Sequence, residues 1–229
     1  KLGSRSARAI KEGLREAGLK AYVLQRQPKN KSAFVINWGN GDFAYPIVAP
    51  LTIINPPAMV RLMTHKLKFF QHIGQSDMSV KWTNDPNEAV RWGVKCMARY
   101  KLQGSGGEGI VVYDPAKHDK FPLGAPLYTV YQQKTHEYRV HMGRGRDNQF
   151  QPLLVQQKMF LKSEERPAPE NWEVRNHANG FIFAKNNIEV PPEVLTVCRD
   201  FMTQLFGGLH FAALDVLYKK GKAYIIEGN

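Results

Sequence analysis

Apolar residues recur at the period of an amphipathic helix in four parts of the chain. The first covers residues 6–17 and follows a serine that can cap a helix. The second runs over residues 58–73 and stops near a glycine, and a shorter one covers residues 87–94. The last covers residues 194–206 after Pro191-Pro192, and proline suits a helix start because its missing N–H would be unpaired there anyway. The pattern predicts a helix in each segment.

Short runs of apolar, β-branched and aromatic residues between these helices predict strands. We expect strands at residues 21–24, 34–38, 95–100, 110–113, 127–132, 137–142, 152–156, 211–217 and 223–226. The third and fourth of these flank the glycine-rich segment 104–109, which predicts a hairpin with a flap-like loop. The first helix and the early strands predict a small α/β unit that ends at Asn55-Pro56-Pro57, and the charged stretch 162–169 predicts a surface loop.

Length and composition are those of a globular protein. The 229 residues are 43% hydrophobic and 23% charged, and the longest apolar run, residues 43–51, is interrupted by two prolines. This run is far shorter than a membrane span, so we expect no membrane partner. Two cysteines and the lack of a secretory signal pattern favour a reducing compartment, and we expect a cytoplasmic location.

The charge of the chain is strongly positive. The chain has 32 basic and 20 acidic residues, which gives a formal charge of +12. Such a charge attracts nucleic acid, anionic nucleotides or acidic proteins. Part of the surplus lies near the N-terminal end, at Arg5, Arg8, Lys11, Arg15, Arg26, Lys29 and Lys31. This group predicts recruitment of a polyanion, and a merely solvated basic surface is the alternative.

Three oxygen-bearing side chains come together at the C-terminal end. Asp215 lies in an apolar strand, and Glu227 and Asn229 alternate on one face of the neighbouring strand. Carboxylates among apolar residues are costly unless a cation neutralises them, and hard oxygen donors suit Mg²⁺. Exposed strand-end acids that pair with nearby lysines are the alternative, and both interpretations stay open at this point.

Cations that can bind phosphate occur before these acids. Lys66 begins a predicted helix turn and Arg99 ends the strand before the glycine-rich segment, although either residue can also be a solvated surface cation. Glu137 and Arg139 lie two apart on one strand and project together, as a hydroxyl acceptor and a phosphate clamp or as a cross-strand ion pair. The glycine-rich segment alone is weak evidence, since it matches neither the P-loop nor the dinucleotide-binding pattern.

The order of these motifs resembles the ATP-grasp carboxylate–amine ligases. The matching segments are His65-Lys-Leu-Lys-Phe-Phe, Gly104-Ser-Gly-Gly-Glu-Gly-Ile-Val-Val, Tyr128-Thr-Val-Tyr131, Glu137-Tyr-Arg-Val-His, Arg175-Asn-His-Ala-Asn-Gly180, Leu214-Asp-Val-Leu and Ile226-Glu-Gly-Asn229. The resemblance covers about residues 60–229. The chain is similar to the ribosomal-protein glutamate ligases. With Asn37-Trp-Gly it is more closely similar to ATP-grasp proteins encoded by bacteriophages. That closeness would place the protein in the host cytoplasm.

The resemblance implies an α+β protein with the ATP-grasp fold, in which two lobes grip ATP. It implies a small α/β domain at residues 1–57, an N-terminal lobe with the flap at residues 58–126, and a C-terminal lobe with the magnesium site at residues 127–229.

The resemblance also implies roles for individual residues. Phosphates would be held by Lys66 and by Arg99 or Lys101, because a lysine is more usual where Arg99 stands. The flap residues Ser105, Gly106, Gly107 and Gly109 would cover the phosphates, the adenine would lie at Val130, Tyr131 and Gln132, and the ribose would meet Glu137. The γ-phosphate and the acyl-phosphate would face Arg139, Lys158, Arg175 and Asn179. Asp215, Glu227 and Asn229 would bind Mg²⁺, or Mn²⁺ in its place.

The implied activity is an ATP-dependent joining of a carboxylate donor to an amine acceptor through an acyl-phosphate, with release of ADP and phosphate. Glu108-Gly-Ile-Val-Val also resembles a motif of nucleic-acid ligases, but the sequence has no Lys-x-Asp-Gly to supply their nucleophilic lysine. A nucleic-acid-binding protein, or an ATP-grasp enzyme whose acceptor is a nucleic acid or an acidic protein, is the alternative.

Overall fold

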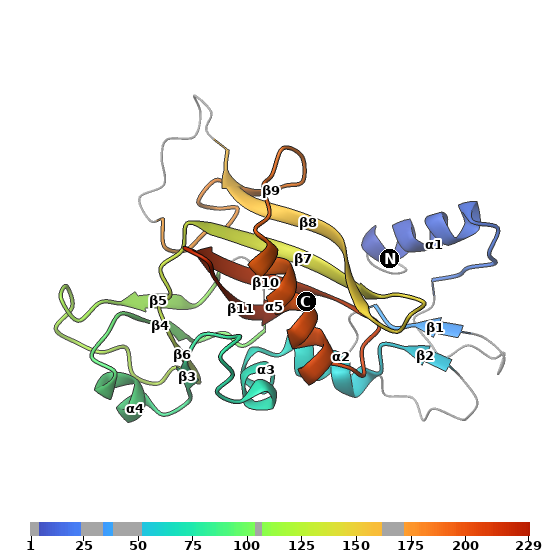
Figure 1. Cartoon of the computed structure of the whole chain (residues 1–229). Helices are drawn as coiled ribbons and strands as arrows, with labels where there is room; N and C mark the ends of the chain where they lie inside the picture. Colours follow the sequence, from blue (N-terminus) through green and yellow to red (C-terminus); the bar gives the residue numbers. More distant parts are fainter. Residues whose placement is uncertain (1–4, 24–33, 39–51, 104–106, 162–171) are drawn as a thin grey trace.

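A computed structural model of the chain describes most of its length. The described residues are 5–23, 34–38, 52–103, 107–161 and 172–229. They form two antiparallel sheets and a small parallel one (Figure 1). Among them, no helix has the length and apolar character needed to cross a membrane.

The larger antiparallel sheet has five strands in the order β11-β10-β7-β8-β9. These strands are β7 (His136–Arg144), β8 (Phe150–Phe160), β9 (Phe181–Ala184), β10 (Phe211–Lys219) and β11 (Lys222–Gly228). Helices α2 (Pro57–Thr64), α3 (Lys66–Ile73) and α5 (Pro192–Leu205) contribute to the same hydrophobic core (Figure 1). This core fixes one face of the sheet, so the other face is left for polar side chains.

Close packing of α2 against β11 depends on a glycine. A Cβ added at Gly228 would lie 1.7 Å from Sδ of Met63, which no side chain can tolerate. Gly228 directly follows Glu227, so the same contact that seals the core also sets the position of that carboxylate.

The smaller antiparallel sheet has four strands in the order β3-β6-β4-β5. They are β3 (Trp82–Thr83), β4 (Cys96–Arg99), β5 (Ile110–Tyr113) and β6 (Leu127–Val130), and helix α4 (Pro86–Arg91) packs beside β3 and β6. Asp85 begins α4, since its carboxylate accepts a hydrogen bond of 2.8 Å from the backbone N–H of Asn87.

The N-terminal elements are α1 (Arg5–Glu16) and a parallel pair formed by β1 (Phe34–Ile36) and β2 (Thr52–Ile54). Figure 1 shows them at one end of the five-stranded sheet, away from the four-stranded sheet.

The helix and strand predictions are largely confirmed, with three corrections. The helix predicted over residues 58–73 is two helices, because His65 takes an extended conformation and its ring accepts a hydrogen bond from the backbone of Lys68 at the start of α3. The helix predicted over 87–94 is shorter and ends before Gly93, whose φ is 61°. Residues 21–23 form no strand, and the sequence patterns missed the short strands β2, β3 and β9.

Several predicted features fall on residues that the structure does not describe. They are Ser4, Leu24, the apolar run 43–51, the loop 162–169, the flap residues Ser105 and Gly106, and the basic residues Arg26, Lys29 and Lys31.

Candidate active site

Alternation along β7 and β10 gathers charged side chains on one face of the five-stranded sheet. Tyr138 and Val140 face the core, so Glu137 and Arg139 project to the opposite face. Asp215 lies directly across from Arg139 in the register of the sheet, and Glu227 lies across from Asp215 on the next strand. This face therefore carries the charged residues that the sequence motifs indicated.

Arg139 and Asp215 form a two-pronged ion pair. Nε of Arg139 lies 2.6 Å from Oδ1 of Asp215, and Nη2 lies 2.8 Å from Oδ2. The Asp215 side chain is only 8% exposed. Burial raises the pKa of Asp215 and nearby Glu227 adds to the rise, while Arg139 opposes it. A second cation, such as a metal ion, would meet a carboxylate already desolvated and fixed in direction.

Glu137 lies between two lysines. Its Oε2 is 3.3 Å from Nζ of Lys134, and its Oε1 accepts a hydrogen bond from Lys158. Burial favours the neutral acid, but the two lysines prevail and hold the pKa of Glu137 below its usual value. Phe183 on β9 lies under the cations, with its ring centroid 4.5 Å from Cζ of Arg139 and 5.2 Å from Nζ of Lys158.

Two further cations approach the same acids from α3 and β4. Nζ of Lys66 is 2.9 Å from Oε1 of Glu227. Arg99 is only 5% exposed, and its buried Nε has no hydrogen-bond partner among the described residues. Burial lowers the pKa of Arg99, although the negative charges of Glu227 and Glu137 oppose this. A buried guanidinium group with an unused donor is suited to an anionic ligand.

These eight residues form what we call the charged cluster. Its members are Lys66, Arg99, Lys134, Glu137, Arg139, Lys158, Asp215 and Glu227. Five cations face three carboxylates, so the cluster has a formal surplus of two positive charges. A surplus held on rigid strands attracts a polyanion such as a nucleoside triphosphate.

The glycine-rich flap reaches the segment that precedes β9. Strands β4 and β5 pair as the predicted hairpin. Gly107 has a φ of 75°, and a Cβ there would lie 2.9 Å from Cγ1 of Val174 and 3.3 Å from Nδ2 of Asn176. Only glycine therefore allows this approach. Lys101 pairs with Glu108 at 2.6 Å in an exposed position and backs onto Gly109, so of the two alternatives Arg99 is the one in the charged cluster.

The residues predicted to line the adenine lie at the end of β6 and directly after it. The backbone N–H groups of Val130 and Tyr131 each donate a hydrogen bond of 2.9 Å to the four-stranded sheet, to the carbonyls of Lys81 and Lys95 respectively. Nζ of Lys95 lies 5.0 Å from the ring centroid of Tyr131 and pairs with Glu173. Gln132 follows them, half-buried, in the connection to β7.

The remaining predicted residues lie around the cluster. Nη1 and Nη2 of Arg175 are each 3.4 Å from the carbonyl oxygen of Thr135, and its buried Nε has no partner among the described residues. Asn179 donates a hydrogen bond of 2.6 Å to the carbonyl of Val174, so its amide organises its own loop. Asn229 is exposed, and its main chain pairs in both directions with Ala213, which places it on the face of Asp215.

Sequence motifs did not single out several residues of this region. Lys134, Phe183 and Lys95 each contact a predicted site residue, and Glu173 pairs with Lys95. Of these four residues, only Lys134 lies close in the sequence to a predicted site residue, three positions before Glu137. The segment has no helical period that would predict contact between the two side chains.

The donor set fits a magnesium ion that takes its other ligands from phosphate. No group of three or more His, Cys, Asp or Glu side chains lies together in the described part of the chain. Asp215 and Glu227 supply two hard oxygen donors opposite one another, and Mg²⁺ commonly needs no more protein carboxylates than this.

One pocket of the structure lies apart from the charged cluster. It has a volume of about 710 Å³ and is open to solvent. Its walls are formed by Gln75, Ser76, Asp77, Ser79, Lys81, Glu88, Lys222, Ala223 and Tyr224. None of the eight cluster residues lines it, so we place the candidate site by its chemistry and not by cavity size.

Comparison with family models and curated proteins finds no match, whereas comparison with solved structures does. No family model and no curated protein matches the chain. D-alanyl-alanine synthetase A of Vibrio cholerae matches 79% of this chain at 13% identity and a TM-score of 0.52. N5-carboxyaminoimidazole ribonucleotide synthetase of Thermotoga maritima matches 78% at 11% identity and 0.51, and the Staphylococcus aureus N5-carboxyaminoimidazole synthetase, complexed with ADP, matches 78% at 12% identity and 0.51.

The chain spans 60%, 44% and 47% of the lengths of these three proteins, respectively. At such identities the likeness concerns the backbone arrangement alone. That arrangement, with the α+β composition and the two antiparallel sheets, shows that the chain has the ATP-grasp fold.

Proposed function

We propose that the chain is an ATP-dependent carboxylate–amine ligase whose ATP and magnesium bind at the charged cluster. The observation that carries this proposal is the cluster itself. Five cations and three carboxylates, most of them largely buried, meet at one face of the five-stranded sheet, and Arg99 keeps an unused donor there. Structural ion pairs alone would not require a surplus of buried positive charge, whereas the phosphates of ATP would neutralise it.

All residues of the charged cluster except Lys134 have a role of their own in this proposal. Lys66 and Arg99 would bind phosphate oxygens, with Glu137 at the ribose and Asp215, Glu227 and Asn229 at the metal. Magnesium, when bound, neutralises charge on the transferring phosphoryl group, and Mn²⁺ can replace it. The adenine would be lined by Val130, Tyr131 and Gln132. The flap, with Ser105, Gly106, Gly107 and Gly109, would cover the phosphates and exclude water from them.

The proposed reaction has two displacements. A carboxylate oxygen of the donor attacks the γ-phosphorus of ATP and ADP leaves, which gives an acyl-phosphate. The amine of the acceptor then attacks the acyl carbon, phosphate leaves, and the amine loses a proton as the amide forms. Arg139, Lys158 and Arg175 would stabilise negative charge in both steps. Asn179 would face the γ-phosphate beside them and holds the loop that carries Arg175. Positioning and electrostatics suffice, so no nucleophilic side chain is needed.

For the donor and the acceptor we propose a chemical class, and for the cellular setting a location. We propose a carboxylate donor and an amine acceptor because the three solved structures share the fold of such ligases. Closeness to bacteriophage-encoded members and a cytoplasmic location stay predictions.

Product analysis tests the proposal. The protein is incubated with ATP, magnesium and a mixture of amino acids, and nucleotides and adducts are measured by mass spectrometry. We expect ADP, phosphate and a condensation product whose mass is lower by one water than the sum of its parts. Release of AMP and pyrophosphate would contradict the assignment, because the cluster would then serve adenylyl and not phosphoryl transfer. A sample of Lys66→Ala protein is the control for contaminating ATPases.

A further inference from the structure

The face of the charged cluster continues toward the opposite end of the five-stranded sheet. Phe211, Ala213 and Asp215 alternate on β10, so their side chains lie on one face. Asp215 lies four residue steps along the strand from Phe211, about 13 Å at the usual rise. Between them, His141 across from Ala213 forms a hydrogen bond of 3.0 Å with Gln156. A partly polar path thus leads from the cluster to Phe211.

This path ends at an aromatic pair whose tryptophan is exposed. The rings of Trp38 and Phe211 lie 5.2 Å apart between centroids, with an angle of 30° between their planes. Trp38 remains 46% exposed, although a tryptophan of a small domain usually buries most of its surface. Leu153 and Leu154 on β8 are exposed near this end of the sheet, Leu154 being opposite His141.

A buried network of hydrogen bonds fixes the aromatic pair. Nδ2 of Asn37, next to Trp38, donates to the carbonyl of Asn55 at 3.0 Å. Nδ2 of Asn55 in turn donates to the carbonyl of Phe211 at 2.9 Å, and its Oδ1 accepts from the N–H of His210 at 2.8 Å. Both asparagines are buried, and Asn55 has a φ of 62°. An exposed ring held by buried polar contacts loses little entropy when a ligand stacks on it.

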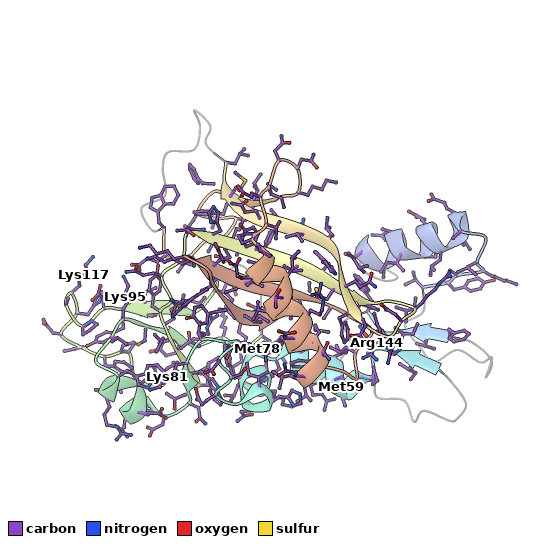
Figure 2. All side chains as sticks on the ribbon, in the orientation of Figure 1. Met59, Met78, Lys81, Lys95, Lys117 and Arg144 are labelled. Atoms are coloured by element: carbon purple, nitrogen blue, oxygen red, sulfur yellow. The ribbon has the colours of Figure 1, made fainter. Side chains whose placement is uncertain are left out.

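Positive charge and a further aromatic residue lie at the same end of the molecule in this view. In Figure 1, α1 and the β1–β2 pair lie at the end of the molecule at which β7 connects to β8. Arg8 and Arg15 of α1 are exposed, and Cζ of Arg15 lies 6.0 Å from the ring centroid of Tyr22. In Figure 2 Arg144 lies at this end too, whereas Lys95 lies at the opposite end near the four-stranded sheet.

We infer that this end of the sheet, with Trp38 as its stacking platform and α1 as its phosphate contact, is the docking surface for a single-stranded nucleic acid. Exposed rings beside a basic element are the combination that binds bases and phosphates of a single strand. Because Phe211 and Asp215 lie on the same face of the sheet, the nucleic acid would carry the acceptor of the ligase, and this part of the inference rests on the proposed function. A neutral aromatic peptide would use the rings but not the charge.

The stacking interaction is tested by fluorescence anisotropy with a labelled single-stranded DNA of about 12 nucleotides. We expect Trp38→Ala to weaken binding about tenfold, which corresponds to ~1.4 kcal/mol. Trp38→Phe should retain most of the affinity. The matched control is Trp172→Ala, which removes an equally exposed tryptophan, 49% against 46%, that packs on Phe160 and Phe181 instead. Thermal melting confirms that each variant is folded.

The phosphate interaction is tested by the dependence of affinity on salt. Arg8→Ala with Arg15→Ala should reduce the slope of log affinity against log salt by about 0.7 for each arginine that pairs with a phosphate of the DNA. Trp38→Ala should leave that slope unchanged, because stacking releases no counterions. Affinity for ATP should not change in any of these variants, since all three residues lie outside the charged cluster.

Three results would overturn the inference. They are no DNA binding at low salt, equal DNA binding by Trp38→Ala and wild type, and Trp38-dependent binding of a neutral Gly-Tyr-Gly peptide without DNA binding. ATP binding is measured separately by isothermal titration. If the proposed ligase function is wrong, the titration would show no ATP binding. The DNA affinities would still show whether the docking surface binds nucleic acid.

Discussion

The two faces of the five-stranded sheet are built from the same strands and serve opposite purposes. On the face toward α5, residues such as Val140, Leu214 and Val216 are fully buried and apolar. On the other face, Arg139 precedes Val140 and Asp215 lies between Leu214 and Val216, and these two charged residues lie across from each other. One face therefore gains stability from burial, while the other holds charges at a cost in free energy.

This contrast explains where a reactive site can be placed in such a fold. Charges on a mobile surface reorganise when a ligand binds, whereas charges on strands that a hydrophobic core anchors from behind do not. The pKa of Asp215 is raised by burial and that of Arg99 is lowered, so both groups are held in unfavourable surroundings. Groups kept charged against burial are typical of binding and catalytic sites.

The largest expected effect comes from removing the charges of the two acids. We expect Asp215→Asn together with Glu227→Gln to lower turnover about 1,000-fold or more, because a metal site contributes several kcal/mol to the transition state. Circular dichroism should still show a cooperative melting transition. Glu193→Gln with Asp200→Asn, both exposed on α5, removes the same charge and should leave turnover unchanged. An active double variant at saturating magnesium would refute the metal assignment.

The opposite face is expected to affect stability alone. Leu214→Ala should destabilise the protein by about 2–5 kcal/mol, because it leaves a cavity at a fully buried position. Molecules that remain folded should bind ATP as wild type does, measured by titration well below the melting temperature. Leu123→Ala, at a 64% exposed leucine, should change neither quantity. Loss of ATP affinity in folded Leu214→Ala protein would show that the two faces are not independent.

The same alternation decides how much could be predicted from the sequence. Period-two patterns located β7 and β10, and with them the common face of Glu137, Arg139 and Asp215. The break at His65 was not predictable, because the apolar period continues through it and only the tertiary position of α3 requires the bend. Strand β9 was missed since four apolar residues after a glycine carry no period.

Interactions between distant segments were also beyond sequence reasoning. Arg99 and Lys101 differ by two positions, which on a continuous strand would give them the same face. The strand β4 ends at Arg99, however, so Lys101 turns toward Glu108 instead. The approach of Gly107 to Val174 depends on how the flap meets a segment far along the chain, and no local pattern reports this.

Replacing Arg99 is expected to have an effect of intermediate size, which raises the stability of the protein and lowers its affinity for ATP. Arg99→Met should stabilise the protein by about 1 kcal/mol, since it removes a charge that burial disfavours. It should also weaken ATP binding about tenfold or more, because a hydrogen bond to a charged group contributes about 1.5–3 kcal/mol. Thermal melting and titration with ATP measure the two effects. Lys101→Met is the control, and if it weakens ATP binding while Arg99→Met does not, the roles of these two cations are reversed.

The smallest effect concerns Gly107 of the flap, where the four-stranded sheet contacts the segment before β9. Gly107→Ala should weaken ATP binding about fivefold, ~1 kcal/mol, because the added methyl group would lie 2.9 Å from Val174 and displace the flap. Gly124→Ala is the matched control, since Gly124 has a φ of 80° but nothing within 4 Å of an added Cβ. It carries the same backbone strain of about 1–2 kcal/mol without the close approach. Val174→Ala should restore ATP affinity in the Gly107→Ala background. Equal ATP affinity in the two glycine variants would show that backbone strain, and not packing across the flap, governs the site.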